Sequence, residues 1–166
     1  MFSYKYLKKS ASHADGSTGL GKGTEGKFSP EEQSAVDQAH VIVENNTYVS
    51  FNRAVMDKVV YYARVYTKPK LYDDTCVKLE DNTYGVIEKI VSIPGHDSLW
   101  AFIKLIRLSL LDGHWVTHIK NRASNTFDSL KLVKLISVSH KCIFIENLAE
   151  SGRSFICEIP NRYERD

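Results

Sequence analysis

From His40 to its end, the chain is a succession of short runs rich in β-branched and aromatic residues, separated by turn-forming residues. Such residues fit a pleated, half-buried surface, so each run is typical of a β-strand. The runs read HVIVENNTYVSF, VVYYARVYT, TCVKLEDNTYGVIEKIVSI, LWAFIKLIRLSLL, SLKLVKLISVS, KCIFIE and SFICEIP. Several strands joined by short turns predict an all-β domain, mostly antiparallel, built as a barrel or a sandwich.

Within this pattern, the stretch VKLEDNTYGVIEKI at residues 77–90 predicts a β-hairpin. Asp81 and Asn82 separate its two apolar runs, and both residue types tolerate the positive φ angles of a tight turn. Residues 53–66 and 99–110 are ambiguous, because their apolar residues also fit the stripe of an amphipathic helix. Their content of Val, Ile, Tyr and Phe favours strands in both segments.

The N-terminal segment differs from the rest of the chain. Residues 15–28, DGSTGLGKGTEGKF, hold five of the nine glycines and partly match two phosphate-binding motifs through Gly21, Gly23 and Gly26. A buried strand should precede such a motif and a helix should follow it, but the flanking sequences fit neither. We therefore expect residues 1–30 to be a disordered tail that binds no nucleotide.

After this tail, residues 31–166 suit a single domain that is long enough to bury a core. The domain should begin with a short helix in PEEQSAVDQA, with Ser29 as its N-cap and Pro30 in its first turn. Glu31 and Glu32 then lie favourably against the positive end of the helix dipole.

The net charge of the chain is +2, and it is unevenly distributed. Residues 1–30 carry five lysines against Asp15 and Glu25, which gives +3 for the tail and leaves −1 for the remainder. The tail lysines are possible phosphate contacts that would support weak, non-specific nucleic-acid binding: Lys5, Lys8, Lys9, Lys22 and Lys27. The near-neutral body argues against broad nucleic-acid binding by the fold itself.

The N-terminus lacks the apolar region of a signal peptide, and no run of residues is long enough to span a membrane. Cys76, Cys142 and Cys157 form no C-x-x-C pair, and an odd number of cysteines suits reduced thiols. We expect an intracellular protein.

Motifs for catalysis or metal binding are incomplete. His114 and His118 are spaced like zinc ligands, but the glutamate of H-E-x-x-H is absent and a third ligand would have to come from elsewhere in the fold. His96, Asp97 and Ser98 hold the three residue types of a hydrolase triad, but adjacent side chains diverge and cannot align as a triad, and the segment IPGHDS at residues 93–98 reads as a turn. The cysteines lie in apolar strands, which does not favour reactive thiolates.

Acidic pairs occur in polar turns and at the helix start, where solvation should keep their pKa values ordinary. They are Glu31-Glu32, Asp73-Asp74 and Glu80-Asp81. We assign no catalytic residue, cofactor or metal to the chain, and we expect no enzymatic activity.

The segment KCIFIENLAESGRSFICE, residues 141–158, predicts a hairpin centred between Ala149 and Glu150. That register places Cys142 opposite Cys157, with Lys141 facing Glu158 and Glu146 facing Arg153, so that charges pair with opposite charges. The two thiols would then be cross-strand neighbours within reach of a disulfide on mild oxidation.

Two stretches of the chain are similar to a known module. They are YTKPKLYDDTCVKLEDNTYGVIEKIV, at residues 66–91, and the ending KCIFI…SFICEIPNRYERD, at residues 141–166. They resemble the C-terminal β-barrel of uncharacterised, mobile-element-associated animal proteins, and this barrel looks like the bromo-adjacent homology (BAH) domain of chromatin proteins. The resemblance covers residues 46–166. It implies a BAH-like or SH3-like fold, a nuclear location and docking on chromatin proteins or histone tails, and it implies no reaction.

Aromatic residues fit this expectation, since a cage of tyrosines binds methylated lysine through cation–π attraction. The candidates are Tyr61, Tyr62, Tyr66, Tyr72 and Tyr84. Ordinary packing in a sheet is the alternative explanation for these tyrosines. The sequence thus predicts a non-enzymatic protein-interaction module, with nucleic-acid binding through the basic tail as the alternative.

Overall fold

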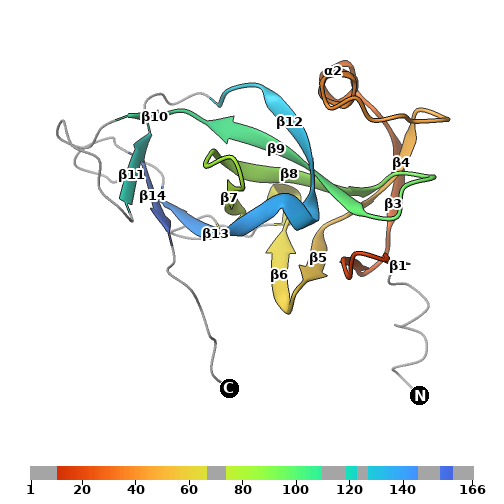
Figure 1. Ribbon diagram of the computed structural model, residues 1–166, viewed down its shortest axis with the longest axis horizontal. Helices are drawn as coiled ribbons and strands as arrows, with labels where there is room; N and C mark the ends of the chain where they lie inside the picture. Colours follow the sequence, from red (N-terminus) through yellow and green to blue (C-terminus); the bar gives the residue numbers. More distant parts are fainter. Residues whose placement is uncertain (1–10, 67–73, 110–118, 123–126, 146–153, 159–166) are drawn as a thin grey trace.

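The computed structural model describes residues 11–66, 74–109, 119–122, 127–145 and 154–158, and this part of the chain is mostly β-strand (Figure 1). The first elements are β1 (Ala11–Ser12), β2 (Thr18–Leu20), β3 (Thr24–Lys27), α2 (Pro30–Gln38), β4 (Thr47–Phe51), β5 (Arg53–Met56), β6 (Val59–Tyr62) and the 3-10 helix η1 (Arg64–Tyr66). The following elements are β7 (Cys76–Leu79), β8 (Tyr84–Ser92), β9 (Leu99–Ile106), β10 (Leu108–Ser109), β11 (Ile119–Arg122), β12 (Leu130–Lys134), the 3-10 helix η2 (Leu135–Ser137), β13 (Val138–Ile145) and β14 (Phe155–Glu158).

The long strand β8 is the centre of the larger sheet. Strand β9 pairs with one edge of β8, whereas β7 and β4 share the other edge. The sheet extends from β7 through β13, β14, β11 and β10, from β4 to β3, and from β9 to β12. A second sheet has the order β1-β2-β5-β6. The all-β, antiparallel prediction is confirmed, but the pairing of the described strands does not close into the barrel that was one of the two expected forms; a sandwich-like arrangement is consistent with it.

Three clusters of buried side chains form the core. The central cluster joins the two sheets and includes Phe51, Met56, Tyr61, Ile87 and Leu135. The helix-side cluster lies between α2 and the larger sheet and includes Val36, Tyr48, Trp100 and Phe102. The third cluster lies on the curved part of the sheet formed by β7, β8, β13 and β14 and includes Cys76, Tyr84, Cys142, Phe144 and Ile156. The helix therefore covers only a part of the sheet (Figure 1).

The residues around α2 show why the chain forms a helix there. The Ser29 side chain accepts a hydrogen bond from the backbone N–H of Glu32 at 3.2 Å, which satisfies one free donor of the first turn. The helix is held on the sheet by Lys89, whose Nζ donates to the Tyr48 hydroxyl at 2.6 Å and to Glu32 at 3.0 Å. Burial opposes the charge of Lys89, but these two bonds outweigh it and raise its pKa.

The prediction of a disordered tail is wrong for residues 11–28. Strand β2 pairs with β1 and β5 in the smaller sheet, and β3 pairs with β4 at an edge of the larger sheet, so the glycine-rich segment contributes a strand to each sheet. The reason is packing: Gly26 lies opposite Tyr48, and a Cβ atom at Gly19 would approach the Phe51 ring to 2.7 Å. Because these glycines have no side chain, aromatic rings lie directly on their backbone. This contact buries apolar ring surface and stabilises the segment, which its glycine-rich composition does not indicate.

The predicted hairpin at residues 77–90 is confirmed as β7–β8, with Val77 opposite Gly85. Its turn is longer than the two residues expected, with residues 80–83 between β7 and β8. Asn82 adopts a positive φ of 64°, whereas Asp81 does not. Within residues 53–66, β5 and β6 are strands, as the β-branched content predicted, but residues 64–66 form the 3-10 helix η1. Within residues 99–110, the described part holds the strands β9 and β10. The first of these segments also contains a turn of its own, which gives the β5–β6 hairpin.

The predicted register of the C-terminal hairpin is wrong by one residue. Cys142 pairs with Glu158, whereas Cys157 pairs with Ile143. A shift of one residue moves a side chain to the other face of a strand, so the two thiols lie on opposite faces, and all three cysteines are free. The observed register sets Phe144 against Ile156, both fully buried. The expected turn around Ala149 and the contact between Glu146 and Arg153 lie outside the described residues.

The ion pair of Glu158 helps to explain why the predicted register is wrong by one residue. Glu158 lies 3.0 Å from Lys78 Nζ of β7, not against Lys141 as predicted. The neighbouring strand β7 therefore contributes to the register, and a comparison of β13 with β14 alone omits it.

Candidate interaction surface

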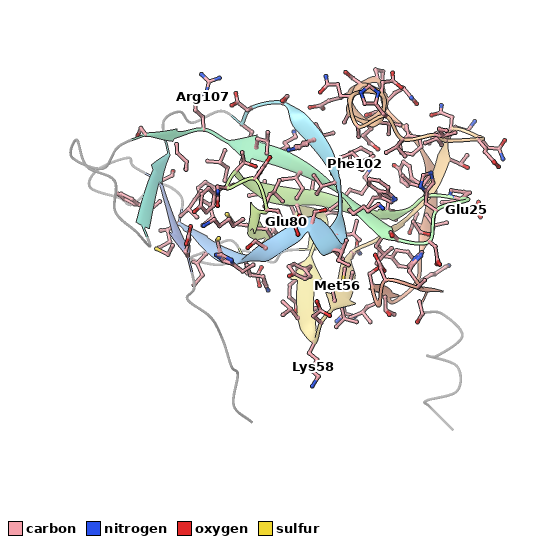
Figure 2. All side chains as sticks on the ribbon, viewed as in Figure 1. Glu25, Met56, Lys58, Glu80, Phe102 and Arg107 are labelled. Atoms are coloured by element: carbon pink, nitrogen blue, oxygen red, sulfur yellow. The ribbon has the colours of Figure 1, made fainter. Side chains whose placement is uncertain are left out.

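The β5–β6 hairpin projects from the body of the molecule, and Lys58 extends from its tip (Figure 2). Asp57 and Lys58 both have positive φ angles, 48° and 65°, as in a two-residue type I′ turn. In such a turn the flanking pair, Met56 and Val59, is hydrogen-bonded. The next pair, Val55 and Val60, is then not hydrogen-bonded. The backbone N–H and C=O of Val60 therefore point away from β5.

This register makes one edge of β6 available to a further strand. Strand β6 ends the four-stranded sheet, and no other strand of the described residues pairs with that edge. The inner face of the hairpin is fixed, since Ala54, Met56 and Tyr61 are buried in the central cluster. Val59, near the tip, has an exposed fraction of 38%. The buried inner face thus fixes the hairpin, and valines form the outer edge of β6 near its tip.

A side chain from β13 covers part of this border. Lys141 Nζ donates to the backbone carbonyl of Val60 at 3.0 Å and lies 5.1 Å from the centre of the Tyr62 ring. Arg53 lies directly opposite Tyr62 on β5. The outer edge of β6 and its neighbours Arg53, Lys58, Tyr62 and Lys141 are called the β6 edge below.

Of the predicted cage tyrosines, the structure describes the side chains of Tyr61, Tyr62 and Tyr84, and these three lie in different surroundings. Tyr61 is buried in the central cluster, where burial and the nearby Asp57 carboxylate raise its pKa. Tyr84 is buried in the third cluster, and Tyr62 lies on the outer face of β6. The Tyr66 side chain and Tyr72 lie outside the described residues.

The face of Tyr84 is occupied by the chain's own lysine. Lys78 Nζ lies 5.6 Å from the centre of this ring and 3.0 Å from Glu158 Oε1. His140 lies 3.8 Å from the same carboxylate, and burial together with the Lys78 charge lowers the pKa of His140. Lys78 thus already occupies the cation position between the Tyr84 ring and the Glu158 carboxylate, and a lysine from a partner would have to displace it.

The structure describes only two of the five lysines that are possible phosphate contacts. Lys22, between β2 and β3, and Lys27, in β3, are exposed, whereas Lys5, Lys8 and Lys9 lie outside the described residues. Gly26 and Lys27, which end the partial phosphate motif, belong to a strand and not to a loop before a helix. Nucleic-acid binding through these lysines stays a prediction.

The other candidate groups take part in turns and ion pairs. The predicted turn at residues 93–98 is present, and the His96 backbone N–H closes it by donating to the Ile93 carbonyl. A nitrogen of the His96 ring lies 2.7 Å from the Ile42 carbonyl. The expectation of an ordinary pKa is wrong for Asp81, because hydrogen bonds from Lys131 and Thr83 lower its pKa to about 2. Burial, followed by the neighbouring Cys142, raises the pKa of Cys157. His114, His118 and Asp73 lie outside the described residues.

Sequence reasoning named Tyr62 but missed Val60 and Lys141, the residues that define the β6 edge. The alternating apolar residues on either side of Asp57-Lys58 were an available sign of a hairpin, although lysine is unusual at a positive φ angle. The contact of Lys141 joins residues 81 positions apart, and no local pattern predicts it.

Among the described residues, no three His, Cys, Asp or Glu side chains are grouped as a metal ion requires. In the same part of the chain, no helix has the length and apolar character needed to cross a membrane. Comparison of the chain with family models, with curated proteins and with solved structures finds no match.

Proposed function

We propose that this protein is a non-enzymatic interaction module that binds an extended segment of a partner protein along the β6 edge. The observation that carries the proposal is the outward-facing backbone of Val60 on a terminal strand. Addition of a strand to a sheet edge is a common mode of peptide recognition, in which main-chain hydrogen bonds supply affinity and side-chain contacts supply specificity.

A comparison of the other terminal strands supports the choice of β6. Strand β3 presents exposed charges at Glu25 and Lys27, which protect an edge against pairing (Figure 2 shows Glu25). Strands β1 and β10 have two residues each, and α2 packs against β12. In contrast, β6 reads Val-Val-Tyr-Tyr, a sequence of strong strand formers.

Partners in chromatin, and with them a nuclear location and a role in a mobile-element protein, are part of this proposal through the resemblance to BAH-like modules. Histone tails are extended peptides and suit strand addition in their backbone.

The proposal is tested with Val60→Pro and its control Val60→Thr. Proline at this position removes an outward-facing N–H and no hydrogen bond of the hairpin, so it blocks strand addition and leaves the fold in place. Threonine keeps the N–H and the preference for a strand. Both variants are first shown to be folded by circular dichroism and thermal unfolding.

Binding is measured by fluorescence anisotropy with labelled ten-residue peptides. The set contains unmodified and lysine-methylated histone-tail peptides and three designed peptides, in which Val alternates with Glu, Gln or Lys. We expect at least one class to bind the natural protein and Val60→Thr, and to lose at least about tenfold in affinity for Val60→Pro. Equal binding by a folded Val60→Pro variant, or failure of every peptide to bind, would reject the proposal.

A further inference from the structure

Residues 11–38 form an arm that lies against the described residues after position 46, which are called the core fold below. The loop of residues 39–46 joins the two parts. Strand β2 of the arm pairs with β5, β3 pairs with β4, and α2 packs against β12. The backbone N–H of Leu99 also donates to the Ser17 hydroxyl at 3.2 Å. The arm is thus held by residues that follow the loop.

The conformation of this loop conflicts with its own sequence. Residues 40–43, His-Val-Ile-Val, are rich in strand formers, and the sequence predicts a strand from His40 onward. In the structure this stretch is irregular, and Ile42 has an exposed fraction of 80%. A conflict between local preference and observed conformation is typical of functional or strained segments.

Two residues with positive φ angles turn the chain back at the ends of this loop. The φ angle is 55° at His40 and 52° at Asn46. His40 directly follows the C-cap of α2, and the Val41 N–H beyond it donates to the Val36 carbonyl. Glycine is usual at such a position, because it has no Cβ atom. A histidine there carries a steric cost, so the closed loop is strained where it leaves the helix.

We propose that two copies of this chain exchange their arms, so that the arm of each copy docks on the core fold of the other. The contacts between arm and core fold are the same in the exchanged dimer, and only the loop changes. Fully extended, residues 39–46 span up to about 28 Å, which lets them connect the two copies. Extension releases the strain at His40. Two loops that run in opposite directions then pair as strands and cover Ile42.

The ion pair of Glu32 and Lys89 detects this exchange directly. Glu32 belongs to the arm and Lys89 to the core fold, and their charged atoms lie 3.0 Å apart. The variants Glu32→Lys and Lys89→Glu each place like charges at this contact. When these two variants exchange arms with each other, both contacts of the dimer again join opposite charges. The double variant Glu32→Lys/Lys89→Glu restores the pair within one chain and serves as the folding control.

The test refolds two kinds of chain together, one of them tagged, by dilution from urea at high chain concentration. The complementary mixture contains Glu32→Lys and Lys89→Glu. The mismatched mixture contains the natural protein and the double variant, for which exchange joins like charges at both contacts. We expect affinity capture to recover at least about tenfold more heterodimer from the complementary mixture. Sedimentation should give this species the mass of two chains.

A second variant tests the role of the loop. His40→Gly removes the strain of the closed loop, so it should lower the dimerisation constant of the natural protein at least about tenfold, since both chains contribute. An unchanged constant would show that the loop does not drive the exchange.

The remaining outcomes decide the exchange itself, which does not depend on the docking of peptides at the β6 edge. Equal recovery from the two mixtures would overturn it, as would natural protein that stays monomeric after refolding at every concentration. A dimer that Val60→Pro abolishes would lie at the β6 edge and would overturn the exchange as well.

Discussion

Replacing Gly19 by alanine tests the packing that turns the glycine-rich segment into part of the fold. Gly19 is buried in β2, and a Cβ atom there would lie 2.7 to 2.8 Å from three atoms of the Phe51 ring. Phe51 is itself buried, so the ring cannot move away into solvent. Overpacking of this kind costs about 1–3 kcal/mol. Alanine regains about 0.5–1 kcal/mol through the lower entropy of the unfolded chain. The net expectation is a loss of up to about 2.5 kcal/mol, centred on about 1 kcal/mol.

The sign of the effect should reverse when the ring is removed. Phe51→Ala on its own should cost about 3–5 kcal/mol, as the loss of a buried aromatic side chain does. In that background Gly19→Ala no longer meets the ring, and only its gain of about 0.5–1 kcal/mol remains. The two substitutions should therefore be coupled by about 1–3 kcal/mol in a double-mutant cycle.

Urea unfolding of the natural protein, the two single variants and the double variant measures this coupling. A parallel thermal series should show shifts of about 2–4 °C for each kcal/mol. If residues 11–28 were a loose linker, Gly19→Ala would be neutral or slightly stabilising in both backgrounds and the coupling would be zero. That result would refute the packing of Phe51 on β2.

Two further predictions follow from the described contacts. Hydrogen bonds from Lys131 and Thr83 hold the pKa of Asp81 near 2, below its ordinary value of 3.8, so its contribution to stability is complete above about pH 5 and is lost as the pH falls toward 2. Because the pair is half exposed, this contribution should be at most about 1 kcal/mol, and Asp81→Asn should remove it from an acid titration of stability; an unchanged titration would contradict the contact. Mild oxidation should not link Cys142 to Cys157, since they face opposite sides of the sheet; a peptide map with this disulfide in a folded sample would show that the register is wrong.

The strands were largely predictable because their signal is local. The alternation around Asp81 and Asn82 predicted the β7–β8 hairpin, and β-branched residues correctly favoured strands at 53–62 and 99–106 within the ambiguous segments 53–66 and 99–110. The glycine-rich segment was not predictable in the same way. Its order depends on Tyr48 and Phe51, which lie some twenty to thirty residues further along the chain, and composition describes only the segment itself.

The sequence did not predict the register of β13 with β14 or the contact at the β6 edge, and the two reasons are related. Pairing energies between β13 and β14 favoured Cys142 opposite Cys157, but Lys78 of β7 sits beside Glu158 and belongs to neither strand. Lys141 of β13 likewise contacts Val60 of β6 across the fold. In both cases a third strand decides the arrangement, and a sequence pattern reports on two neighbouring strands at most.

The anchoring of the hairpin bears directly on how tightly an added strand can bind. A docking strand loses conformational freedom on binding, and affinity falls further when the receiving strand must also be ordered. Strand β6 does not carry this second cost, since Tyr61 and Met56 are almost fully buried and the type I′ turn fixes its register with β5. Weakening this anchor with Met56→Ala should thus reduce affinity for the peptides that bind the natural protein, even though Met56 faces away from the β6 edge. An unchanged affinity, in a variant shown to be destabilised, would mean that rigidity of β6 plays no part in binding.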